Sequence, residues 1–198
     1  IREAFVAPPG HVLLSADWSQ FELRLLAHLS GDRELIRGFC SGADLHRRTA
    51  SALFDLPEDE VTPEERNIGK TVNFATLYGQ GPVALSQQLG IPHREAKLYI
   101  DRFFALYSGV RAWRERTIAQ AYADGFVTTV TGRRRFLPEL TIRTTSDRAY
   151  GERLATNTPV QGSAADLCKG AMRTIAAQLE DRQLRSALVL QIHDELLL

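Results

Sequence analysis

The stretch ALVLQIHDELLL, residues 187–198, decides how this chain folds. Its first six residues are apolar apart from Gln191, and a short apolar run of this kind predicts a buried strand. His193 and Asp194 follow as a turn, and residues 195–198 begin a strand that returns along the first. The stretch therefore predicts two antiparallel strands at one end of the sequence.

A second short apolar run, VLLSA at residues 12–16, lies near the other end of the sequence and stops at Asp17. It is also short enough to be a buried strand. The residues between the two runs are dominated by helix signals. We therefore expect an α+β fold, in which a small antiparallel sheet is built from both chain ends and a mostly helical lobe is inserted between them.

Three tetrapeptides have the form of a helix capping box, in which a hydroxyl residue precedes an acidic one by three positions. They are SQFE at 19–22, TPEE at 62–65 and SAAD at 163–166. The first predicts a helix through about Leu29, the second a helix to about Tyr78, and the third a helix through about Leu179. We also expect short helices within 33–60, helices at roughly 93–107 and 110–124, and a small hairpin within 125–132.

The composition is that of an ordinary globular protein, with 198 residues, 44% hydrophobic and 24% charged. It has no apolar run of about 18 residues that would span a membrane, and no signal-peptide pattern. The two cysteines, Cys40 and Cys168, lack metal-type spacing, which argues against a zinc or disulfide scaffold and favours a reducing cytoplasm.

Positive charge is concentrated in the middle of the sequence, although the net charge is zero. Residues 66–136 carry 11 basic and 4 acidic side chains, whereas residues 1–65 carry 6 and 12. Of the 24 basic residues 21 are Arg, which suits bidentate phosphate contacts. A solvated helical surface in an arginine-favouring genome would give the same pattern, so charge alone leaves these two interpretations even.

Two carboxylates are placed where strands end. Asp17 follows the run at 12–16, and Asp194 lies at the turn between the two C-terminal strands. If these strands are neighbours, both aspartates reach the same edge of the sheet, where they could hold two Mg²⁺ ions. Taken singly, Asp17 could be a helix cap and Asp194 a turn former.

Four residues recur every fourth position along the helix predicted to begin at Pro63. They are Arg66, Lys70, Phe74 and Tyr78, which form one slowly turning stripe. The two cations could bind a triphosphate, and the aromatic rings could pack on a sugar or base. The alternative is that both rings are core residues and both cations are solvated.

The ordered set of these motifs resembles the DNA polymerase I-like, family A DNA polymerases. DWSQFELR at 17–24 is similar to the family's first palm motif, residues 66–79 to its fingers helix, and QIHDE at 191–195 to its third motif. DLHR at 44–47, GRRR at 132–135 and residues 153–165 also follow the pattern. The resemblance spans nearly the whole chain, with Trp18 and Phe21 departing from the usual residues of the first motif.

This resemblance implies a role for each matching residue. Metal-binding residues would be Asp17 and Asp194, with Glu195 as an adjacent carboxylate of lesser role. Contacts to the incoming nucleotide would come from Gln20, Glu22, His46, Arg66, Lys70, Phe74 and Tyr78, with Lys70 also giving a proton to pyrophosphate. Glu22 would exclude ribonucleotides, or serve only as the capping-box partner of Ser19. Contacts to primer–template DNA would come from Arg153, Asn157, Gln161 and His193.

The implied activity is template-directed transfer of dNMP from dNTP to a primer 3′-hydroxyl with two Mg²⁺ ions, releasing pyrophosphate. Residues 1–32 and 146–198 would form the palm and residues 33–145 the fingers of the right-hand polymerase fold. The thumb and any exonuclease domain would lie outside this chain, as parts of a longer enzyme.

Two alternatives stay open at this point: a single-subunit, phage-type RNA polymerase, and a DNA-binding piece without activity. Glu22 and Phe74 favour deoxyribonucleotides over ribonucleotides. The expected partners are primer–template DNA and dNTP, with no membrane, and the parent enzyme is expected to be a monomer in the bacterial cytoplasm, associated with the nucleoid.

Overall fold

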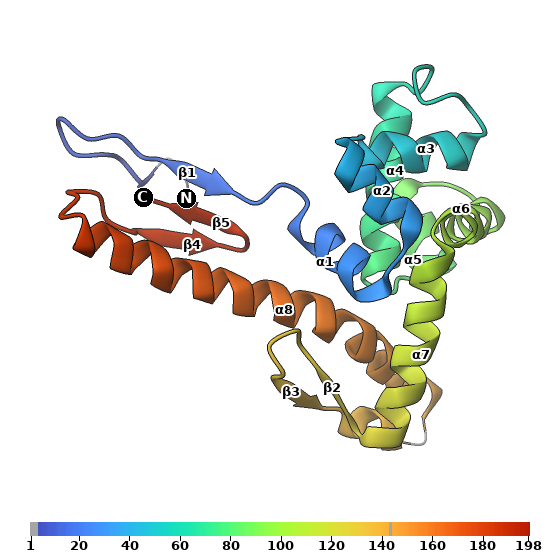
Figure 1. Cartoon of the computed structure of the whole chain (residues 1–198). Helices are drawn as coiled ribbons and strands as arrows, with labels where there is room; N and C mark the ends of the chain where they lie inside the picture. Colours follow the sequence, from blue (N-terminus) through green and yellow to red (C-terminus); the bar gives the residue numbers. More distant parts are fainter. Residues whose placement is uncertain (1–3, 143) are drawn as a thin grey trace.

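A small antiparallel sheet brings together residues from both ends of the chain in the computed structural model, which describes residues 4–142 and 144–198. Its strands are β1 (Ser15–Asp17), β5 (Glu195–Leu197) and β4 (Leu190–Ile192), in that order, and each neighbouring pair is antiparallel. Figure 1 shows β1 and β5, from opposite ends of the sequence, side by side in this sheet. The first strand differs from the expectation, because it begins at Ser15 and all three of its residues are exposed.

Helices α1 to α7 form a lobe on one side of the sheet (Figure 1). Their core contains Leu23, Leu26, Leu45, Leu53, Val72, Phe103 and Tyr107, each at most 1% exposed. This lobe is the helical insertion that the sequence predicts, and α5 within it was not expected. The helices are α1 (Phe21–Ser30), α2 (Arg33–Ser41), α3 (Leu45–Phe54), α4 (Pro63–Leu77), α5 (Pro82–Leu89), α6 (His93–Leu106) and α7 (Ser108–Asp124).

One long helix, α8 (Thr145–Asp181), connects the lobe to the sheet. It has 37 residues and continues through Pro159. Figure 1 shows it passing beneath the sheet, with the hairpin β2 (Phe126–Thr128) and β3 (Arg134–Phe136) on its lower side. A 3₁₀ helix, η2 (Pro138–Thr141), follows this hairpin. A second, smaller core of Ala121, Val127, Leu137, Leu140 and Ala155 fills the space where α7, the hairpin and α8 meet.

Only one of the three predicted capping boxes caps a helix. At α4 the Thr62 hydroxyl accepts from the Glu65 N–H at 3.2 Å, and the Glu65 carboxylate accepts from the Thr62 N–H at 2.8 Å. The box at Ser19 is wrong, because the N-cap of α1 is Gln20, whose left-handed backbone (φ 54°) provides no side-chain cap. Glu22 is therefore free of the capping role.

The third predicted box, at residues 163–166, lies in the middle of α8 and begins no helix. Its side chains instead hold the hairpin. The Ser163 hydroxyl accepts from the Val130 N–H at 2.9 Å, and the Asp166 carboxylate accepts from the Thr129 hydroxyl at 2.7 Å. The predicted hairpin exists, but its second strand is formed by residues 134–136 rather than within 125–132.

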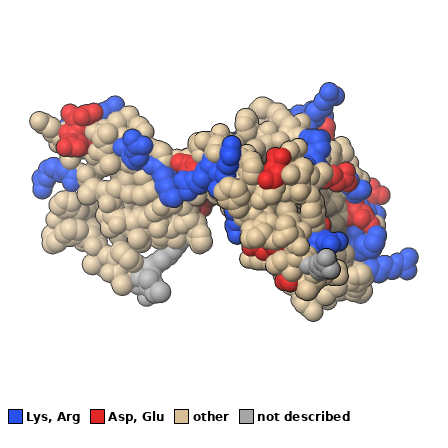
Figure 2. All heavy atoms as spheres, turned by 90° about the horizontal axis from the view of Figure 1, so that it is seen from below, with Lys and Arg blue, Asp and Glu red and all other residues tan. Residues whose placement is uncertain are grey.

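The molecule has two masses joined by a narrower waist. Figure 2 shows the view from below, in which Lys and Arg side chains lie in a band across this waist. Within residues 4–142 and 144–198, none of the helices has the length and apolar character needed to span a membrane. Both cysteines in the described chain, Cys40 and Cys168, are free thiols.

Candidate functional site

The two predicted catalytic aspartates lie at the same edge of the sheet. Asp17 ends β1 opposite Glu195 of β5, and the Trp18 N–H donates to the Asp194 carbonyl at 3.4 Å. His193 has a left-handed backbone (φ 55°), which turns the chain between β4 and β5. The tight turn and the pairing of β1 with β5 therefore place Asp194 beside Asp17.

Glu195 is engaged within the sheet. Its carboxylate accepts from the Ser15 hydroxyl at 2.6 Å, across the β1–β5 pair. This contact holds the Glu195 side chain against β1, where it supports the pairing of the two strands.

A pocket of about 760 Å³ opens in front of these aspartates. It lies where the sheet edge, α1, α4 and α8 come together, so residues far apart in the sequence share one cavity. Ten predicted site residues line it: Asp17, Gln20, Glu22, His46, Lys70, Phe74, Tyr78, Gln161, His193 and Asp194. Arg66, Arg153, Asn157 and Glu195 are not among the residues that line it.

The α4 stripe forms one wall of this pocket. Lys70 is exposed, and Phe74 and Tyr78 are half-buried. The rings of Phe74 and Tyr78 are stacked with centroids 6.2 Å apart, and the His46 ring centroid lies 5.9 Å from that of Phe74. The stripe therefore presents a cation followed by a row of rings, and the alternative of a purely core role for Phe74 and Tyr78 does not fit this exposure.

Tyr78 connects three parts of the pocket. Its hydroxyl donates to the Glu22 carboxylate at 2.5 Å, and its backbone carbonyl accepts from the Asn157 side-chain amide at 3.2 Å. Burial raises the pKa of Tyr78, and the hydrogen bond to Glu22 raises it further. Tyr78 therefore stays a protonated donor that holds Glu22 of α1 against the end of α4.

Arg66 is paired with Asp44 in this structure. One Asp44 oxygen caps α3 by accepting from the backbone of His46 at 3.0 Å and Arg47 at 3.2 Å, and the other accepts from Arg66 Nε at 2.5 Å. Burial opposes ionisation of Asp44, but the hydrogen bonds and charge of Arg66 lower its pKa overall. Asp44 is thus a carboxylate that orients Arg66 at the edge of the pocket.

The close contact of α3 with α4 brings His46 and Lys70 into the same pocket. Gly69 makes this contact possible, because a Cβ there would lie 2.3 Å from the His46 carbonyl oxygen.

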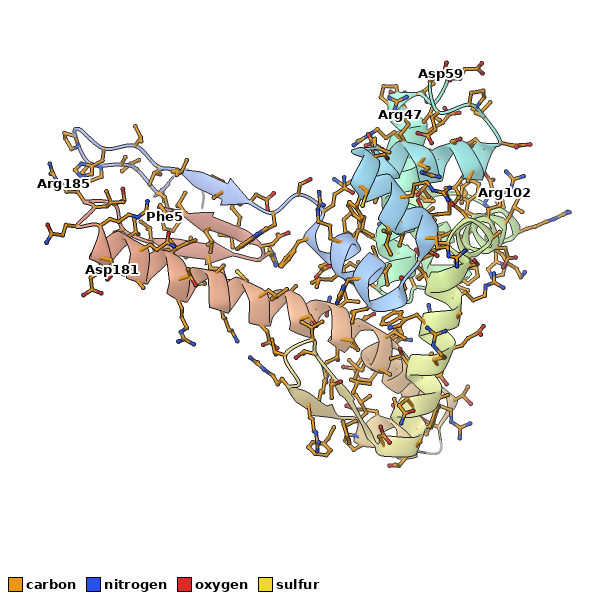
Figure 3. The ribbon with its side chains drawn as sticks, viewed as in Figure 1. Phe5, Arg47, Asp59, Arg102, Asp181 and Arg185 are labelled. Carbon is orange, nitrogen blue, oxygen red and sulfur yellow. The ribbon has the colours of Figure 1, made fainter. Side chains whose placement is uncertain are left out.

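Arg47 fixes the segment that leads into α4, since its guanidinium donates to the carbonyls of Glu58 at 3.0 Å and Val61 at 2.6 Å. Figure 3 shows Arg47 at the top of the helical lobe, near the loop that carries Asp59.

Three predicted DNA-contact residues follow one another along α8 at every fourth position. Gln161 is exposed and lines the pocket. Asn157 bonds Tyr78, and Arg153 lies against Gly79, where an added Cβ would be 3.2 Å from its side chain. The three residues therefore extend from the pocket along α8 toward the C-terminal end of α4.

Several pocket residues were not singled out from the sequence. Gln191 donates to the His193 carbonyl at 2.9 Å and to the Cys168 sulfur at 3.2 Å, which braces the β4–β5 turn. The sequence signal that could have identified Gln191 is that it is the polar residue in an otherwise apolar strand. Ala164 and Ala165 lie in the stretch 153–165 that resembles the family, but nothing there marked them as pocket residues. Cys168 gave no signal, because its position depends on the continuous course of α8.

Comparison with known proteins assigns the chain to a family. The sequence model of DNA polymerase family A matches residues 1–198. The chain belongs to DNA polymerase family A. It is 50% identical over 198 residues to the thermostable DNA polymerase I of Thermus thermophilus, covering 100% of this chain and 24% of that protein. It is 46% identical to DNA polymerase I of Pseudomonas aeruginosa, covering 100% of this chain and 22% of the relative.

The fold agrees with this assignment. The solved POL domain of Pol1 from M. smegmatis, in complex with DNA primer-template and dNTP, matches with a TM-score of 0.94 and 46% sequence identity. The match covers 100% of this chain and 35% of that one. The mixed helix and strand content is therefore that of a family A polymerase domain, and the chain spans about a quarter of the length of its curated family A relatives.

Proposed function

We propose that this chain is the catalytic core of a DNA-directed DNA polymerase that transfers dNMP from dNTP to a primer 3′-hydroxyl and releases pyrophosphate. The observation that carries this proposal is the pocket in which Asp17 and Asp194 face Lys70 and the rings of α4. Carboxylates at one wall suit metal ions, and a cation followed by rings at the other suits a nucleoside triphosphate. The family assignment supports the same reaction.

The division into palm and fingers follows from this proposal. Residues 1–32 and 146–198 would form the palm, which contains the sheet and most of α8. Residues 33–145 would form the fingers, which contain α2 to α7 and the β2–β3 hairpin. The pocket lies between these two parts, as a site that holds a nucleotide against a primer end would require.

Asp17 and Asp194 fit the binding of magnesium. Mg²⁺ is usually held by one or two carboxylates together with water and substrate phosphates, rather than by a complete protein cage. Among residues 4–142 and 144–198, no three His, Cys, Asp or Glu side chains form a metal cluster. Two Mg²⁺ ions would supply charge neutralisation and a more acidic primer hydroxyl. Asp17 and Asp194 would hold them at the sheet edge, with Glu195 securing the strands.

The nucleotide would lie along α4. Lys70 and His46 would contact its phosphates within the pocket, and Lys70 would also protonate the departing pyrophosphate. Arg66 would reach the phosphates from the pocket edge by exchanging or sharing its contact with Asp44. A cation beside oxygens that gain charge during the reaction stabilises the transition state.

The sugar and base would meet the opposite end of the same stripe. Phe74 would pack against the sugar and Tyr78 would guard the insertion position, while Gln20 and Glu22 close the space on the α1 side. Primer–template DNA would follow Arg153, Asn157 and Gln161 along α8, and His193 at the β4–β5 turn would position the primer end.

Primer extension tests this proposal. The 198 residues would replace the matching segment of the Thermus thermophilus relative, so that the chain acts within a polymerase of full length. We expect template-directed extension with dNTPs and little with NTPs. Extension with NTPs would indicate an RNA polymerase instead, and DNA binding without extension would indicate an inactive binding module.

A further inference from the structure

A chain of buried polar groups runs through the helical lobe to the pocket. His46, Thr49, Asn73 and Tyr107 are at most 4% exposed. The Tyr107 hydroxyl lies 3.1 Å from Thr49 Oγ1, which donates to Asn73 Oδ1 at 2.8 Å, and Asn73 Nδ2 lies 2.9 Å from His46 Nδ1. His46, at the end of this hydrogen-bonded series, is the one of the four residues that lines the pocket.

The direction of the hydrogen bonds follows from the number of protons. Burial raises the pKa of Tyr107 to about 12, so its hydroxyl keeps the proton that it donates to Thr49. Thr49 has a single hydroxyl proton, and its two acceptors are Asn73 Oδ1 and the Leu45 carbonyl. The Leu45 carbonyl already accepts a backbone N–H within α3, so it stays satisfied when the Thr49 proton goes to Asn73 Oδ1. Donation to Oδ1 then directs the Asn73 NH₂ group toward His46.

We propose that Asn73 is a positioning residue that keeps His46 in the tautomer with its proton on Nε2. Because Nδ1 accepts from Asn73, Nε2 is the ring nitrogen left for the pocket, where it presents an N–H donor. This inference rests on the proposed function for the identity of the acceptor, a phosphate oxygen of the incoming nucleotide. Neither the motif at residues 44–47 nor the α4 stripe singles out Asn73.

Fixing the tautomer is needed because the His46 ring is neutral. Burial lowers the pKa of His46, the positive charges of Arg66 and Lys70 lower it further, and Asp44 opposes this. A neutral imidazole has one donor and one acceptor nitrogen. In the other tautomer a lone pair would face the phosphate and repel it, so the polar chain determines whether His46 attracts or repels the nucleotide.

Nitrogen-15 solid-state NMR of histidine side chains reads the tautomer directly, without nucleotide and without regard to protein size. The sample is the full-length polymerase carrying this chain, and the loss of signal in His46→Gln assigns the ring. We expect the protonated nitrogen to be Nε2. Asn73→Asp replaces the NH₂ donor by an acceptor of the same shape and should move the proton to Nδ1. Asn67→Asp, which adds the same charge at an exposed site of α4, should leave the ring unchanged.

Thr49 provides a second test that does not alter Asn73. Thr49→Val removes the hydroxyl that orients the amide, so the Asn73 side chain can turn and the Nδ1-protonated ring should appear. Thr49→Ser keeps the hydroxyl, so the His46 ring should stay protonated on Nε2 as in the wild type. A role of Thr49 in packing alone would give the opposite ranking, because serine fills the buried space less well than valine.

Extension kinetics with dNTP test whether a phosphate oxygen of the nucleotide accepts the hydrogen bond from His46. In Asn73→Asp we expect a roughly tenfold higher KM, the size of one lost charge-assisted hydrogen bond. The carboxylate also raises the pKa of His46, so lowering the pH should protonate both nitrogens and restore affinity. The charges of Asp44, Arg66 and Lys70 act on the His46 ring in the wild type and in Asn73→Asp alike, so they do not account for a difference in pH dependence between the two. A packing defect would not recover at lower pH.

Each result decides a different part of this inference. A wild-type ring protonated on Nδ1, or a ring that Asn73→Asp and Thr49→Val leave unchanged, overturns the role of Asn73. A moved proton with an unchanged KM overturns the contact between His46 and phosphate. Failure of the wild-type polymerase to extend a primer overturns the proposed function, while the NMR measurement still decides the tautomer.

Discussion

At the scale of single residues, Asp17 and Asp194 lead to the most direct prediction. The test protein is the Thermus thermophilus polymerase in which this chain replaces the matching segment. In it, Asp17→Asn or Asp194→Asn should lower extension by several orders of magnitude while DNA binding is largely kept. Either change removes a charge that the proposed metal site requires but preserves the shape of the side chain. Single-turnover extension and a DNA-binding titration measure the two effects. Near-normal extension by either variant would rule out the paired-carboxylate site.

Glu22 allows a sharper experiment, because the structure removes its alternative role. It does not cap α1, and its carboxylate is held by the Tyr78 hydroxyl. Glu22→Ala should therefore raise kcat/KM for a matched NTP relative to dNTP. Tyr78→Phe, which removes only the hydroxyl, should have a smaller effect in the same direction. Unchanged sugar selectivity in Glu22→Ala would mean that the residue is not beside C2′.

At the scale of elements, Asp166 holds the β2–β3 hairpin on α8. Its side chain is 4% exposed and pairs with Arg133. The hydrogen bond from Thr131 lowers the pKa of Asp166, burial opposes this, and Thr129 and Arg133 lower it further. Because the folded-state pKa is lowered, this stabilisation is present above the usual carboxyl pKa and is lost as the pH falls through the lowered value.

Asp166→Asn should therefore lower the free energy of unfolding at neutral pH by about 1–3 kcal/mol. The wild type should also lose more stability than the variant between about pH 5 and about pH 3. Urea unfolding at both pH values measures this, and Asp101→Asn, in an exposed pair with Lys97, is the matched control. Equal acid sensitivity of the wild type and Asp166→Asn would contradict the ionised role.

The elements also indicate how far sequence reasoning reaches. The start of α4 was predicted because all parts of its cap are local: Thr62, Pro63 and Glu65 lie within four residues. The boxes at Ser19 and Ser163 have the same local pattern, but tertiary partners use their side chains instead. Tyr78 takes Glu22, and the hairpin takes Ser163 and Asp166. Local patterns therefore fail where a distant partner competes for the same group.

In the candidate site, too, the features set by local sequence could be predicted and those set by distant partners could not. The aspartates and the α4 stripe were recognisable from strand ends and helical periodicity, and most of the residues assigned through the family resemblance line the pocket. The pairing of Arg66 with Asp44 and the buried chain ending on His46 depend on the packing of α3 against α4. No periodicity in a single sequence encodes that contact, so these features became visible only in the folded chain.

At the scale of the whole molecule, Asp32 ties the beginning of the lobe to α7. It is 3% exposed. One carboxylate oxygen accepts from the N–H groups of Glu34 and Leu35 at 3.0 Å, and the other accepts from the Gly109 N–H at 2.8 Å. Asp32 thus caps α2 and also holds the first turn of α7.

Asp32→Ala should lower the free energy of unfolding by about 2–4 kcal/mol, since it removes a cap and leaves a buried N–H without its acceptor. Asp59→Ala, at the exposed loop labelled in Figure 3, should change it by less than about 0.5 kcal/mol. Equilibrium denaturation of both variants measures the difference. Similar stabilities for the two would mean that Asp32 does not join α2 to α7.

The sheet that joins both chain ends also sets the order of events during synthesis. Ser15 and Glu195 are 180 residues apart in sequence, yet their side chains meet across β1 and β5. At ribosomal rates of about 5–20 residues per second, Glu195 is added roughly 10–40 seconds after Ser15. The local contacts of the helical lobe can form during this interval, whereas β1 must wait for its partner. Asp17 and Asp194 therefore stay apart on the nascent chain until almost all of this segment has been translated.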